Sequence, residues 1–381
     1  MAILIYIPFK SNIGYAIRSL ESTFFNVAMK VYKDQSKIFF CYQDLSGGKP
    51  DSLPRSFENY FSIENEFSKK EHKKVCQLIS KHNIHTFFGL DIPVNHPAYK
   101  FYRSSGIKQI FAYWGAPMSS LNPPLKLLVK KLEVFLNRSQ PDHYIFESKA
   151  MAKSATMGRG VSSKRISVVN LGVDTNKYTP LTDNSPYVSN LFLIPPNRRI
   201  VTYSGHMEKR KGVDIIVKAA AHIVNSLNRD DIHFLLLGNK DGEEQQYSSL
   251  YKNTKAENFI TFGGYRDDLH LIFPCCHIGV IASTGWDSFT KSSLEMASCG
   301  LPRIVSDLQG LPETIIEGKS GVSFTPGDYI ALSDKILSII DTPEQLKKMS
   351  LAARNQASET FSIDHQESEL TRILQTYSKE L

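Results

Sequence analysis

Short apolar runs alternate with longer amphipathic segments along most of the chain. The first run, MAILIYIP, covers residues 1–8, and a turn at residues 11–14 separates it from a helical pattern over residues 15–30. Apolar or β-branched runs with helical segments between them are typical of buried parallel strands. A first series of predicted strands lies at residues 1–8, 38–42, 86–90, 109–113, 143–146 and 166–169.

A polar stretch interrupts this alternation after Tyr178. It reads TPLTDNSPYVSN and is rich in Pro, Asn, Ser and Thr, as linkers are. A second series of predicted strands follows at residues 199–203, 233–237, 259–262, 277–281 and 303–305.

The pattern as a whole predicts an α/β protein with two parallel-sheet domains. We expect them to cover residues 1–185 and 186–361, and we expect a helix over residues 362–381 to pack back on the first domain. Ligands of open α/β sheets bind beyond the carboxyl ends of the strands. The expected ligand site therefore lies between the two domains.

Composition fits a large enzyme with ordinary cores. The chain has 381 residues, of which 41% are hydrophobic, and this length suits two domains better than one. No apolar run approaches the roughly 18 residues of a membrane span. The apolar start has no basic segment and no small-residue cleavage site, so we expect a strand there and not a signal peptide. The five cysteines are scattered, which favours a reducing cytoplasm.

Charge is divided unevenly along the chain. Residues 1–180 carry 25 Lys and Arg against 13 Asp and Glu, and residues 181–381 carry 20 against 25. A basic first half suggests an anionic surface or an anionic acceptor as its partner. The alternative is a basic surface that is only solvated.

Residues 123–138, PPLKLLVKKLEVFLNR, combine an apolar stripe with three lysines. Lys126, Lys130 and Lys131 flank the stripe at helical spacing. Such a helix can lie in the interface of an anionic membrane, with the protein peripheral on its inner face. The alternative is that the stripe packs on the domain's own sheet. The apolar residues of the stripe are Leu125, Leu128, Val129, Leu132, Phe135 and Leu136.

Two carboxylates frame a run of small and hydroxylated residues near the end of the second series. Asp287 lies eight positions before Glu295, and a helical pattern starts near Thr290. The first-turn amides of a helix face the preceding loop and favour an anion. The segment therefore offers a phosphate seat with a carboxylate on either side, which suits the diphosphate of a nucleotide sugar.

This segment resembles the donor-site signature of the retaining GT-B glycosyltransferases of family 4 (glycosyl transferases group 1). The family pattern is an acidic residue, a Gly-Phe-Gly-like turn, a second Glu and then Ala-x-x-Gly-x-Pro. Here Asp287 replaces the usual first Glu, and Ser288 and Thr290 replace the two glycines, which bears on the choice of donor sugar. The remaining matches are Phe289, Glu295, Ala297, Gly300, Pro302 and the following Gly310-Leu311-Pro312-Glu313.

Weaker landmarks of the same family precede this segment. Lys211, in KRKGVD, is similar to the family's diphosphate-binding Lys, whereas His206 stands where the family has an Arg. Gly14 resembles the glycine of the loop after the first strand, and Trp114 occupies a position where the family often has His. Residues 168–174, VVNLGVD, resemble the family's strand before the second domain.

The resemblance implies a fold and a mechanism. The fold is GT-B, two Rossmann-like domains that face a central cleft, with the donor on the second domain and the acceptor on the first. Lys211, with Arg210 or His206 and the amides at Phe289–Lys291, stabilises the leaving diphosphate. Glu295 holds the ribose hydroxyls and Asp287 the sugar hydroxyls. The leaving phosphate takes the acceptor's proton on the same face, so no protein nucleophile is needed.

The resemblance also assigns the site residues. The catalytic residues are Lys211, Asp287 and Glu295. The donor-binding residues are Gly14, His206, Arg210, Lys211, Asp287, Ser288, Phe289, Thr290, Lys291 and Glu295, and the acceptor-side candidates are Asn12, Tyr15 and Trp114.

Motifs of other chemistries are absent from the sequence. It contains no Asp-x-Asp, GxGxxG or HExxH motif and no Cys/His cluster with zinc spacing, so we expect no metal and no cofactor. No basic-aromatic pattern of an RNA reader is present, so we expect no nucleic acid partner.

The expected function is transfer of a sugar, with retention, from a nucleotide sugar to a glycan, glycolipid or lipid-linked acceptor in envelope polysaccharide or glycolipid synthesis. A UDP-sugar is the favoured donor and GDP-mannose the second. The alternatives are a GT-B nucleotide-sugar epimerase and a non-catalytic nucleotide-sugar-binding module.

Overall fold

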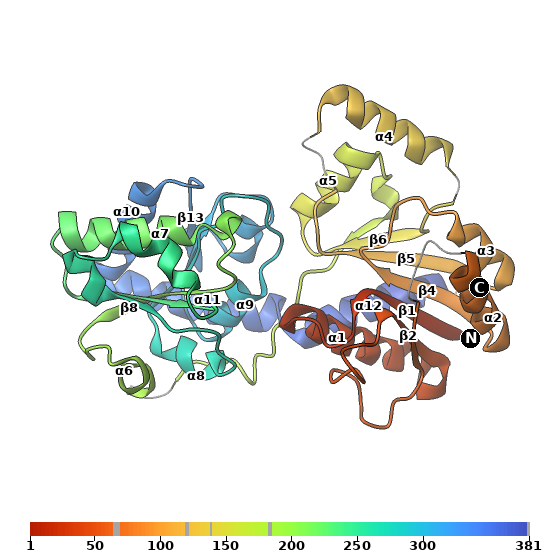
Figure 1. The fold of residues 1–381 in the computed structure, drawn as a ribbon, viewed down its shortest axis with the longest axis horizontal. Coiled ribbons are helices and arrows are strands. Elements are labelled where there is room, and N and C mark those ends of the chain that lie inside the picture. The colour runs from red at the N-terminus through yellow and green to blue at the C-terminus, as the bar shows by residue number, and fades with distance from the viewer. Residues whose placement is uncertain (64–68, 119–121, 138, 182–184, 379–381) are drawn as a thin grey trace. The chain divides into compact units, whose positions relative to one another are not determined.

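The computed structural model describes residues 1–63, 69–118, 122–137, 139–181 and 185–378. The chain divides into two compact units (Figure 1). Unit 1 comprises Met1–Asn170 and Asp364–Leu381, and unit 2 comprises Leu171–Ile363. Residues 171–185, which the linker composition assigned to the first domain, fall in unit 2.

Unit 1 is built on a parallel sheet of seven strands in the order β3-β2-β1-β4-β5-β6-β7. The sequence predicted six of these strands and missed β3, which is short and only half-buried. The strands are β1 Ala2–Lys10, β2 Ile38–Asp44, β3 Tyr60–Ser62, β4 Ile84–Leu90, β5 Gln109–Trp114, β6 His143–Phe146 and β7 Ile166–Val168.

Helices connect the strands of unit 1 and cover its sheet. Residue chemistry fixes several of their ends. The hydroxyl of Ser148 accepts a hydrogen bond from the Met151 amide at the start of α5, and Gly160 ends that helix with φ 72°. The helices are α1 Tyr15–Tyr32, α2 Lys69–Lys81, α3 Ala98–Ser105, α4 Pro124–Leu136, α5 Lys149–Arg159 and α12 Ile363–Ser378, with single turns η1 Gln35–Lys37 and η2 Ser163–Arg165.

The helix α12 contacts the rest of unit 1 through polar side chains. Glu367 accepts hydrogen bonds from Asn26 at 2.8 Å and from Lys30 at 2.6 Å, both on α1. The Tyr377 hydroxyl lies 2.7 Å from Nδ1 of His143 on β6. These contacts tie the last helix to the first part of the chain.

Unit 2 has a parallel sheet of six strands in the order β10-β9-β8-β11-β12-β13. The strands are β8 Arg199–Ser204, β9 Ile232–Leu237, β10 Ile260–Phe262, β11 Ile278–Ile281, β12 Arg303–Ser306 and β13 Gly321–Phe324. The α-helices are α6 Tyr187–Phe192, α7 Val213–Ala221, α8 Leu269–Ile272, α9 Lys291–Ser298, α10 Tyr329–Ile340 and α11 Pro343–Thr360.

Short 3-10 helices and one π-helix complete unit 2. They are η3 Lys209–Lys211, η4 His222–Ser226, η5 Glu243–Leu250, η6 Lys255–Phe259, η7 Phe273–Cys275 and η8 Leu311–Thr314, of which η4 is the π-helix.

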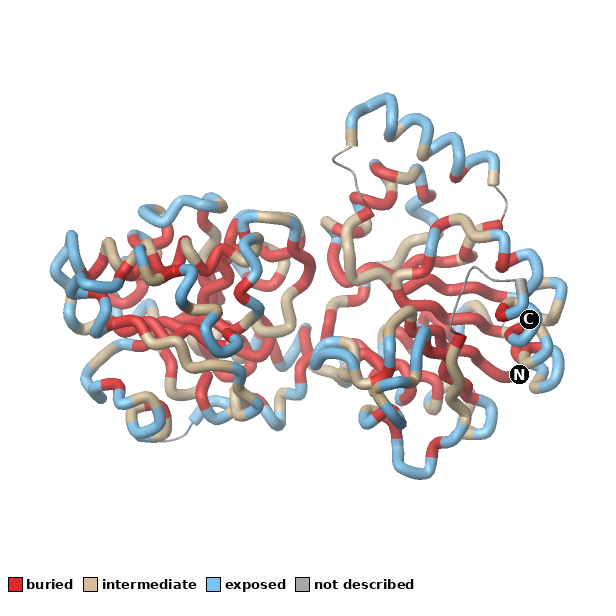
Figure 2. The backbone as a smooth tube through the Cα atoms, viewed as in Figure 1, coloured by how far each residue is buried: buried red, intermediate tan, exposed pale blue. Residues whose placement is uncertain are grey.

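In both units the strands form the core (Figure 2). Strand β9 is buried along its whole length, as expected for a parallel strand that helices cover on both faces. The two series of strands alternating with helices confirm the α/β fold class. Among the described residues, no helix is long and apolar enough to cross a membrane.

Candidate functional site

The strand order of unit 2 reverses between β8 and β11. From β8 the chain builds outward to β9 and β10, and then returns to add β11, β12 and β13 on the other side. Loops that leave the carboxyl ends of two such strands in opposite directions open a crevice, which is where ligands of open α/β sheets bind. Lys211 follows β8 and Asp287 follows β11, so both lie at this point.

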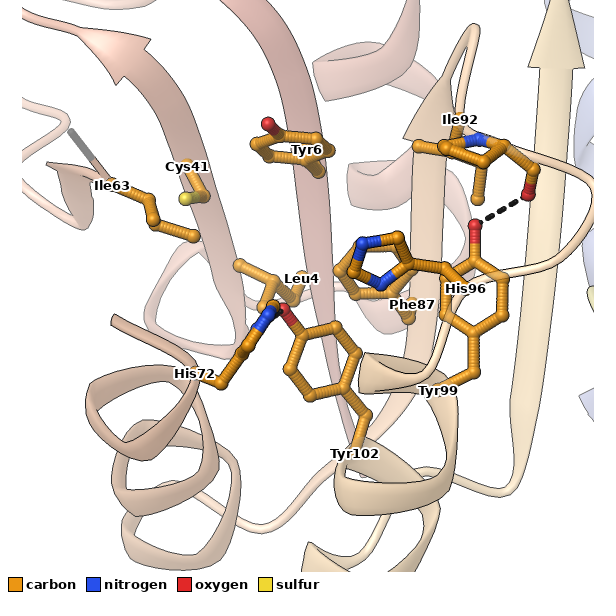
Figure 3. A pocket seen from close by; sticks show the side chains of 11 residues that line it. Leu4, Tyr6, Cys41, Ile63, His72, Phe87, Ile92, His96, Tyr99 and Tyr102 are labelled. Atoms are coloured by element: carbon orange, nitrogen blue, oxygen red, sulfur yellow. Dashed lines mark hydrogen bonds between the residues drawn. The ribbon is translucent and has the colours of Figure 1, made fainter. Parts of the chain in front are cut away.

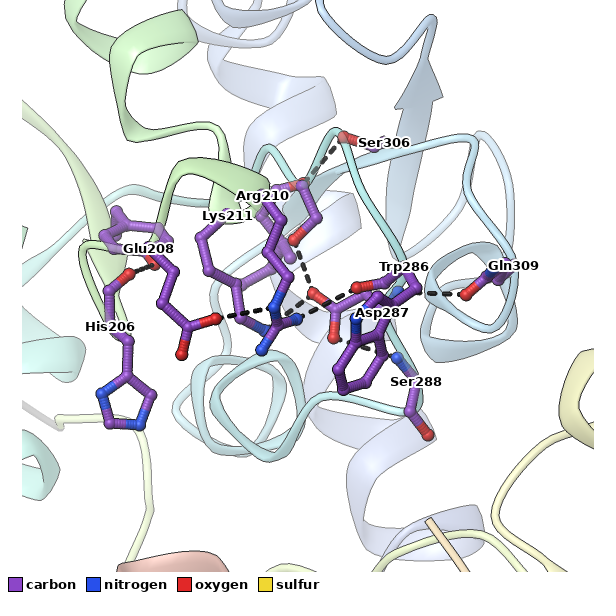
Figure 4. A network of polar contacts seen from close by, with 12 residues as sticks. His206, Glu208, Arg210, Lys211, Trp286, Asp287, Ser288, Ser306 and Gln309 are labelled. Carbon is purple, nitrogen blue, oxygen red and sulfur yellow. Dashed lines mark hydrogen bonds and ion pairs between the residues drawn. The ribbon is translucent and has the colours of Figure 1, made fainter. Parts of the chain in front are cut away.

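Lys211 and Asp287 form an ion pair at the centre of a polar network (Figure 4). Lys211 Nζ lies 2.8 Å from Asp287 Oδ2, and the exposed fractions of the two side chains are 15% and 5%. Ser283 Oγ donates to the same oxygen at 2.5 Å, and the Ser288 amide donates to Oδ1 at 2.9 Å. The Asp287 amide in turn donates to Oε1 of Gln309 at 3.0 Å.

A glycine allows the loop after β8 to approach the loop after β11. Gly212 has φ 66°, and a Cβ there would lie 1.9 Å from the carbonyl oxygen of Ala282. The Thr284 and Gly285 amides donate to the Arg210 carbonyl at 2.7 and 3.2 Å. The two loops are thus joined through their backbones, which fixes Lys211 beside Asp287.

Arg210 is bound within the network. Its Nε donates to Glu208 at 2.7 Å, its Nη1 donates to the Trp286 carbonyl at 3.0 Å, and its guanidinium stacks 4.1 Å from the Trp286 ring centroid. His206 is exposed, and in Figure 4 its imidazole lies apart from the Lys211–Asp287 pair. Of the three predicted diphosphate cations, Lys211 is the one that pairs with Asp287.

The helix α9 begins at Lys291, four residues after Asp287. Thr290 is its N-cap residue but makes no side-chain cap bond, and no described residue is a hydrogen-bond partner of its buried Oγ1. Phe289 is 2% exposed and packs against Phe361, so only its backbone can face a ligand. The beginning of α9 is therefore the anion-favouring end that the sequence indicated.

Glu295 lies within α9 and is buried, with 2% of its surface exposed. The neighbouring Ser293 donates to Thr314 of η8 at 2.9 Å, which ties the helix to the loop after β12. Ser288, also predicted at the site, is buried beside Asp287. The structure thus collects Lys211, Asp287, Ser288 and Glu295 on two neighbouring loops and one helix.

In unit 1 the strand order reverses between β1 and β4, and Asn12, Gly14 and Tyr15 follow β1. The Asn12 side chain donates to the carbonyls of Gly47 and Lys49 and accepts from the Asp51 amide, so it fixes the loop after β2. Gly14 has φ 57° with no atom near its missing Cβ, and Tyr15 is 43% exposed.

Trp114 ends β5 and packs on the hydrophobic core of unit 1, as a core aromatic does. Its indole nitrogen is buried, and it has no hydrogen-bond partner among the residues that the structure describes.

Sequence reasoning missed Asp91 at this second reversal. Asp91 follows β4 with φ 47°, and its Oδ1 accepts from the Gly115 amide at 3.0 Å. Burial raises its pKa to about 6. An Asp directly after an apolar strand, as in FFGLDIP, is the signal that could have indicated it. Gln309 and Ser283 were missed because nothing in their local sequence distinguishes them.

A small apolar pocket lies elsewhere in unit 1, between the sheet and α2 and α3 (Figure 3). Tyr6, Phe87 and Tyr102 line it together with His72. Tyr99, also in its wall, donates to the Pro93 carbonyl at 2.7 Å. None of the predicted site residues lines this pocket.

Two Rossmann-like parallel-sheet units define a GT-B protein, and comparisons with known proteins agree. A solved structure of Anabaena Alr3699/HepE in complex with UDP superposes with a TM-score of 0.79 at 17% identity, over 99% of this chain and 100% of that chain. A glycosyltransferase from Rickettsia africae ESF-5 gives 0.80 at 18% identity, over 99% and 98%. The chain has the GT-B fold.

Sequence comparison finds a family match within unit 2. Residues 190–356, within unit 2, match the family model described as "Glycosyl transferases group 1". A D-inositol 3-phosphate glycosyltransferase of Gordonia bronchialis is 26% identical over 251 residues, 63% of this chain and 53% of that protein. An N-acetyl-alpha-D-glucosaminyl L-malate synthase of Bacillus anthracis is 28% identical over 169 residues, 44% and 43%. The chain spans about half the length of the curated relatives it matches.

Proposed function

We propose that the protein is a retaining glycosyltransferase that moves a sugar from a nucleotide sugar to a glycan, glycolipid or lipid-linked acceptor. The observation that carries the proposal is the buried Lys211–Asp287 pair at the strand reversal of unit 2, with Asp287 on the loop that leads into α9. A diphosphate needs a cation and backbone amides in one place, and this site offers both.

The proposed roles follow from charge and position. Lys211 and the amides at the start of α9 stabilise the diphosphate as it leaves. Arg210 is paired with Glu208 and stacked on Trp286, and Lys211 is paired with Asp287. We assign most of this charge stabilisation to Lys211. Glu295 holds the ribose. The proposal requires no metal ion and no cofactor, since Lys211 supplies the cation at the diphosphate.

The proposed reaction proceeds on one face of the donor sugar. A hydroxyl oxygen of the acceptor forms the new bond to the anomeric carbon while the bond from that carbon to the diphosphate oxygen breaks. The acceptor's proton passes to the departing phosphate, so the configuration is retained without a protein nucleophile. The acceptor-side candidates are Tyr15, Trp114 and, through its hold on the loop after β2, Asn12.

A donor screen tests this function. UDP-sugars, which we favour, and GDP-mannose are compared by thermal shift, and the stabilising donor is then assayed for nucleotide release with and without lipid extract. We expect release that depends on an acceptor. Release or sugar inversion without any acceptor favours the epimerase, and stabilisation without turnover favours a binding module.

We further propose that α4 docks the protein on an anionic membrane, which makes it a peripheral protein on the cytoplasmic face. The apolar stripe of this helix is turned to solvent. Leu125 is 75% exposed, Phe135 82% and Leu136 75%, and Leu128, Val129 and Leu132 are about half exposed. Val134, on the opposite face, is the buried residue of the helix. The stripe therefore does not pack on the unit's own sheet.

The charges beside the stripe suit an anionic surface. Burial lowers the pKa of Lys130, and the neighbouring cations Arg159 and Lys126 lower it further. Each lysine near an anionic lipid surface contributes about 1 kcal/mol of binding. Arg138, the last residue of the predicted segment, lies outside the described residues.

Liposome co-sedimentation tests the docking. We expect binding to rise with anionic lipid and to fall with salt. A Lys126→Glu/Lys130→Glu/Lys131→Glu variant should lose it. The matched control is Lys70→Glu/Lys73→Glu/Lys81→Glu, which makes the same change of charge on the exposed side of α2. If both triple variants bind alike, or if the protein ignores anionic liposomes at low salt, α4 is not the docking element.

A further inference from the structure

The Asp287 carboxylate is committed to protein groups on both of its oxygens. Oδ2 accepts from Lys211 Nζ at 2.8 Å and from Ser283 Oγ at 2.5 Å, and Oδ1 accepts from the Ser288 amide at 2.9 Å. The residue is 4% exposed. A carboxylate has roughly four lone-pair sites, and protein groups already use three of those of Asp287.

Side-chain length explains this placement. Aspartate is one methylene shorter than the glutamate that the family usually has, so its carboxylate stays close to its own backbone. There it bonds to the next amide in the chain and to Ser283, which lies just after β11. The loop is held from the other side by Gln309, which accepts from the Asp287 amide. The carboxylate is thus fixed at the base of the loop.

Lys211, in contrast, keeps hydrogen-bonding capacity. An ammonium has three N–H donors, and the structure gives Lys211 Nζ a bond to Asp287 while its side chain is 15% exposed. A free lysine side chain has many rotamers, and ordering it on a ligand weakens binding. Asp287 removes this cost because it already holds the ammonium in place.

We propose that Asp287 is a positioning residue for Lys211 and does not hold the donor sugar. The inference rests on the proposed function, because it assigns Lys211 to the diphosphate. The two roles predict different effects of losing the carboxylate. Loss of a sugar ligand affects binding of the nucleotide sugar but not of the free nucleotide, whereas loss of a positioning residue affects both to the same degree.

Calorimetry with UDP and with GDP, the nucleotides without sugar, tests the proposal. In Asp287→Ala we expect affinity for the nucleotide that the wild type binds to fall about tenfold, roughly the effect of releasing one ordered side chain. Asp287→Asn keeps an oxygen that can accept from Lys211, so it should restore much of the affinity. The ratio of affinities for the nucleotide sugar and the free nucleotide should stay unchanged in both variants.

A double-mutant cycle separates a direct effect from one that acts through Lys211. In a Lys211→Ala background, Asp287→Ala should cost little further affinity. Ser283→Ala, a milder change that frees one side of the carboxylate, should weaken nucleotide binding in the same direction. Asp214→Ala is the matched control, because it breaks a Lys–Asp pair of 2.9 Å on the surface of α7 and should change nothing.

The outcomes distinguish this inference from the function on which it rests. If the wild type binds neither nucleotide, the proposed function fails and the inference fails with it. If the wild type binds but Asp287→Ala binds UDP or GDP as well as or better than the wild type, only the positioning role fails. Additive losses in the cycle likewise overturn it. Melting temperatures of all variants identify any general loss of fold.

Discussion

At the scale of single residues, the proposed chemistry depends on the charge of Lys211. Replacing it by alanine removes one preorganised cation from a leaving group, which should lower kcat by about 10² to 10³. Steady-state assays with the donor identified by thermal shift measure this loss. Lys218→Ala, a surface lysine of α7, is the control. Turnover within a few-fold of the wild type in Lys211→Ala would contradict the assignment.

Glu295 should act on the nucleotide. Glu295→Gln preserves its shape within the buried part of α9 but removes the charge that accepts hydrogen bonds from ribose hydroxyls. We expect the affinity for the free nucleoside diphosphate to fall about tenfold, as for the loss of a hydrogen bond to a charged group. Calorimetry measures it. An unchanged affinity would contradict the assignment, and a lowered melting temperature alongside it would show that Glu295 is structural.

The residues of the site could be predicted from the sequence more readily than their contacts. Lys211 and Asp287 stand in recognisable local motifs, but they are 76 residues apart, and no local pattern shows that they pair. Gln309 accepts a hydrogen bond from the Asp287 amide, and Ser283 donates one to the Asp287 carboxylate. Neither residue stands in a recognisable motif. Asn12 was predicted on the acceptor side, and its side-chain amide holds the loop after β2 through Gly47 and Asp51.

At the scale of elements, Gly212 connects the turn η3 to α7 and lets two loops touch. In Gly212→Ala the new methyl must displace the Ala282 carbonyl, in addition to the backbone strain of a positive φ. Gly264 provides a matched control, since it has φ 72° but no atom within 4 Å of its missing Cβ.

We expect Gly264→Ala to cost about 1 kcal/mol of unfolding free energy and Gly212→Ala at least about 2 kcal/mol more, from overpacking. Denaturant unfolding of the two variants gives the difference. Equal losses would mean that the close approach of Ala282 relaxes freely.

The helix α4 shows why a pattern can predict an element but not its orientation. The spacing of its apolar residues defines one face, whether that face packs on the sheet or lies on a membrane. Only the packing of α4 reveals that this face is exposed. Strands β3 and β13 show a second limit. They are three and four residues long and partly exposed, so their apolar pattern is too short to separate them from loops.

At the scale of the whole molecule, the two units should respond differently to acid. Burial lowers the pKa of His233 and His277 in unit 2 to about 4. Histidines held neutral in the folded state stabilise it above their unfolded pKa of about 6.5, and this contribution is lost as the pH falls towards 4. Each is worth on the order of 2 to 3 kcal/mol.

Unit 1 has opposing groups. His143 behaves like the two histidines of unit 2, with its pKa lowered by burial to about 4. Burial also raises the pKa of Asp91 to about 6 and that of Glu21 above its usual value. A carboxyl with a raised pKa destabilises the fold at neutral pH, and this penalty disappears as the pH falls below its folded pKa. As the pH falls, the stability that unit 1 gains from Asp91 and Glu21 therefore offsets the stability that it loses from His143. Asp91 and Glu21 give no such compensation to unit 2.

We expect unit 2 to unfold before unit 1 near pH 4.5. The difference between the two unfolding transitions should be smaller at neutral pH. The two tryptophans make this measurable, because Trp114 lies in unit 1 and Trp286 in unit 2. Fluorescence of Trp286→Phe reports unit 1 alone, and that of Trp114→Phe reports unit 2 alone. Coincident transitions at every pH, or earlier loss of unit 1, would refute the argument.

The return of α12 to unit 1 has a consequence for synthesis of the chain. Unit 2 is continuous, so all of its strands and helices have been made once Ile363 has been added. Unit 1 still lacks the partner of Asn26 and Lys30 at that moment, because Glu367 comes later. On the ribosome, unit 1 begins before unit 2 but is completed after it, the reverse of the usual order in which domains emerge and fold.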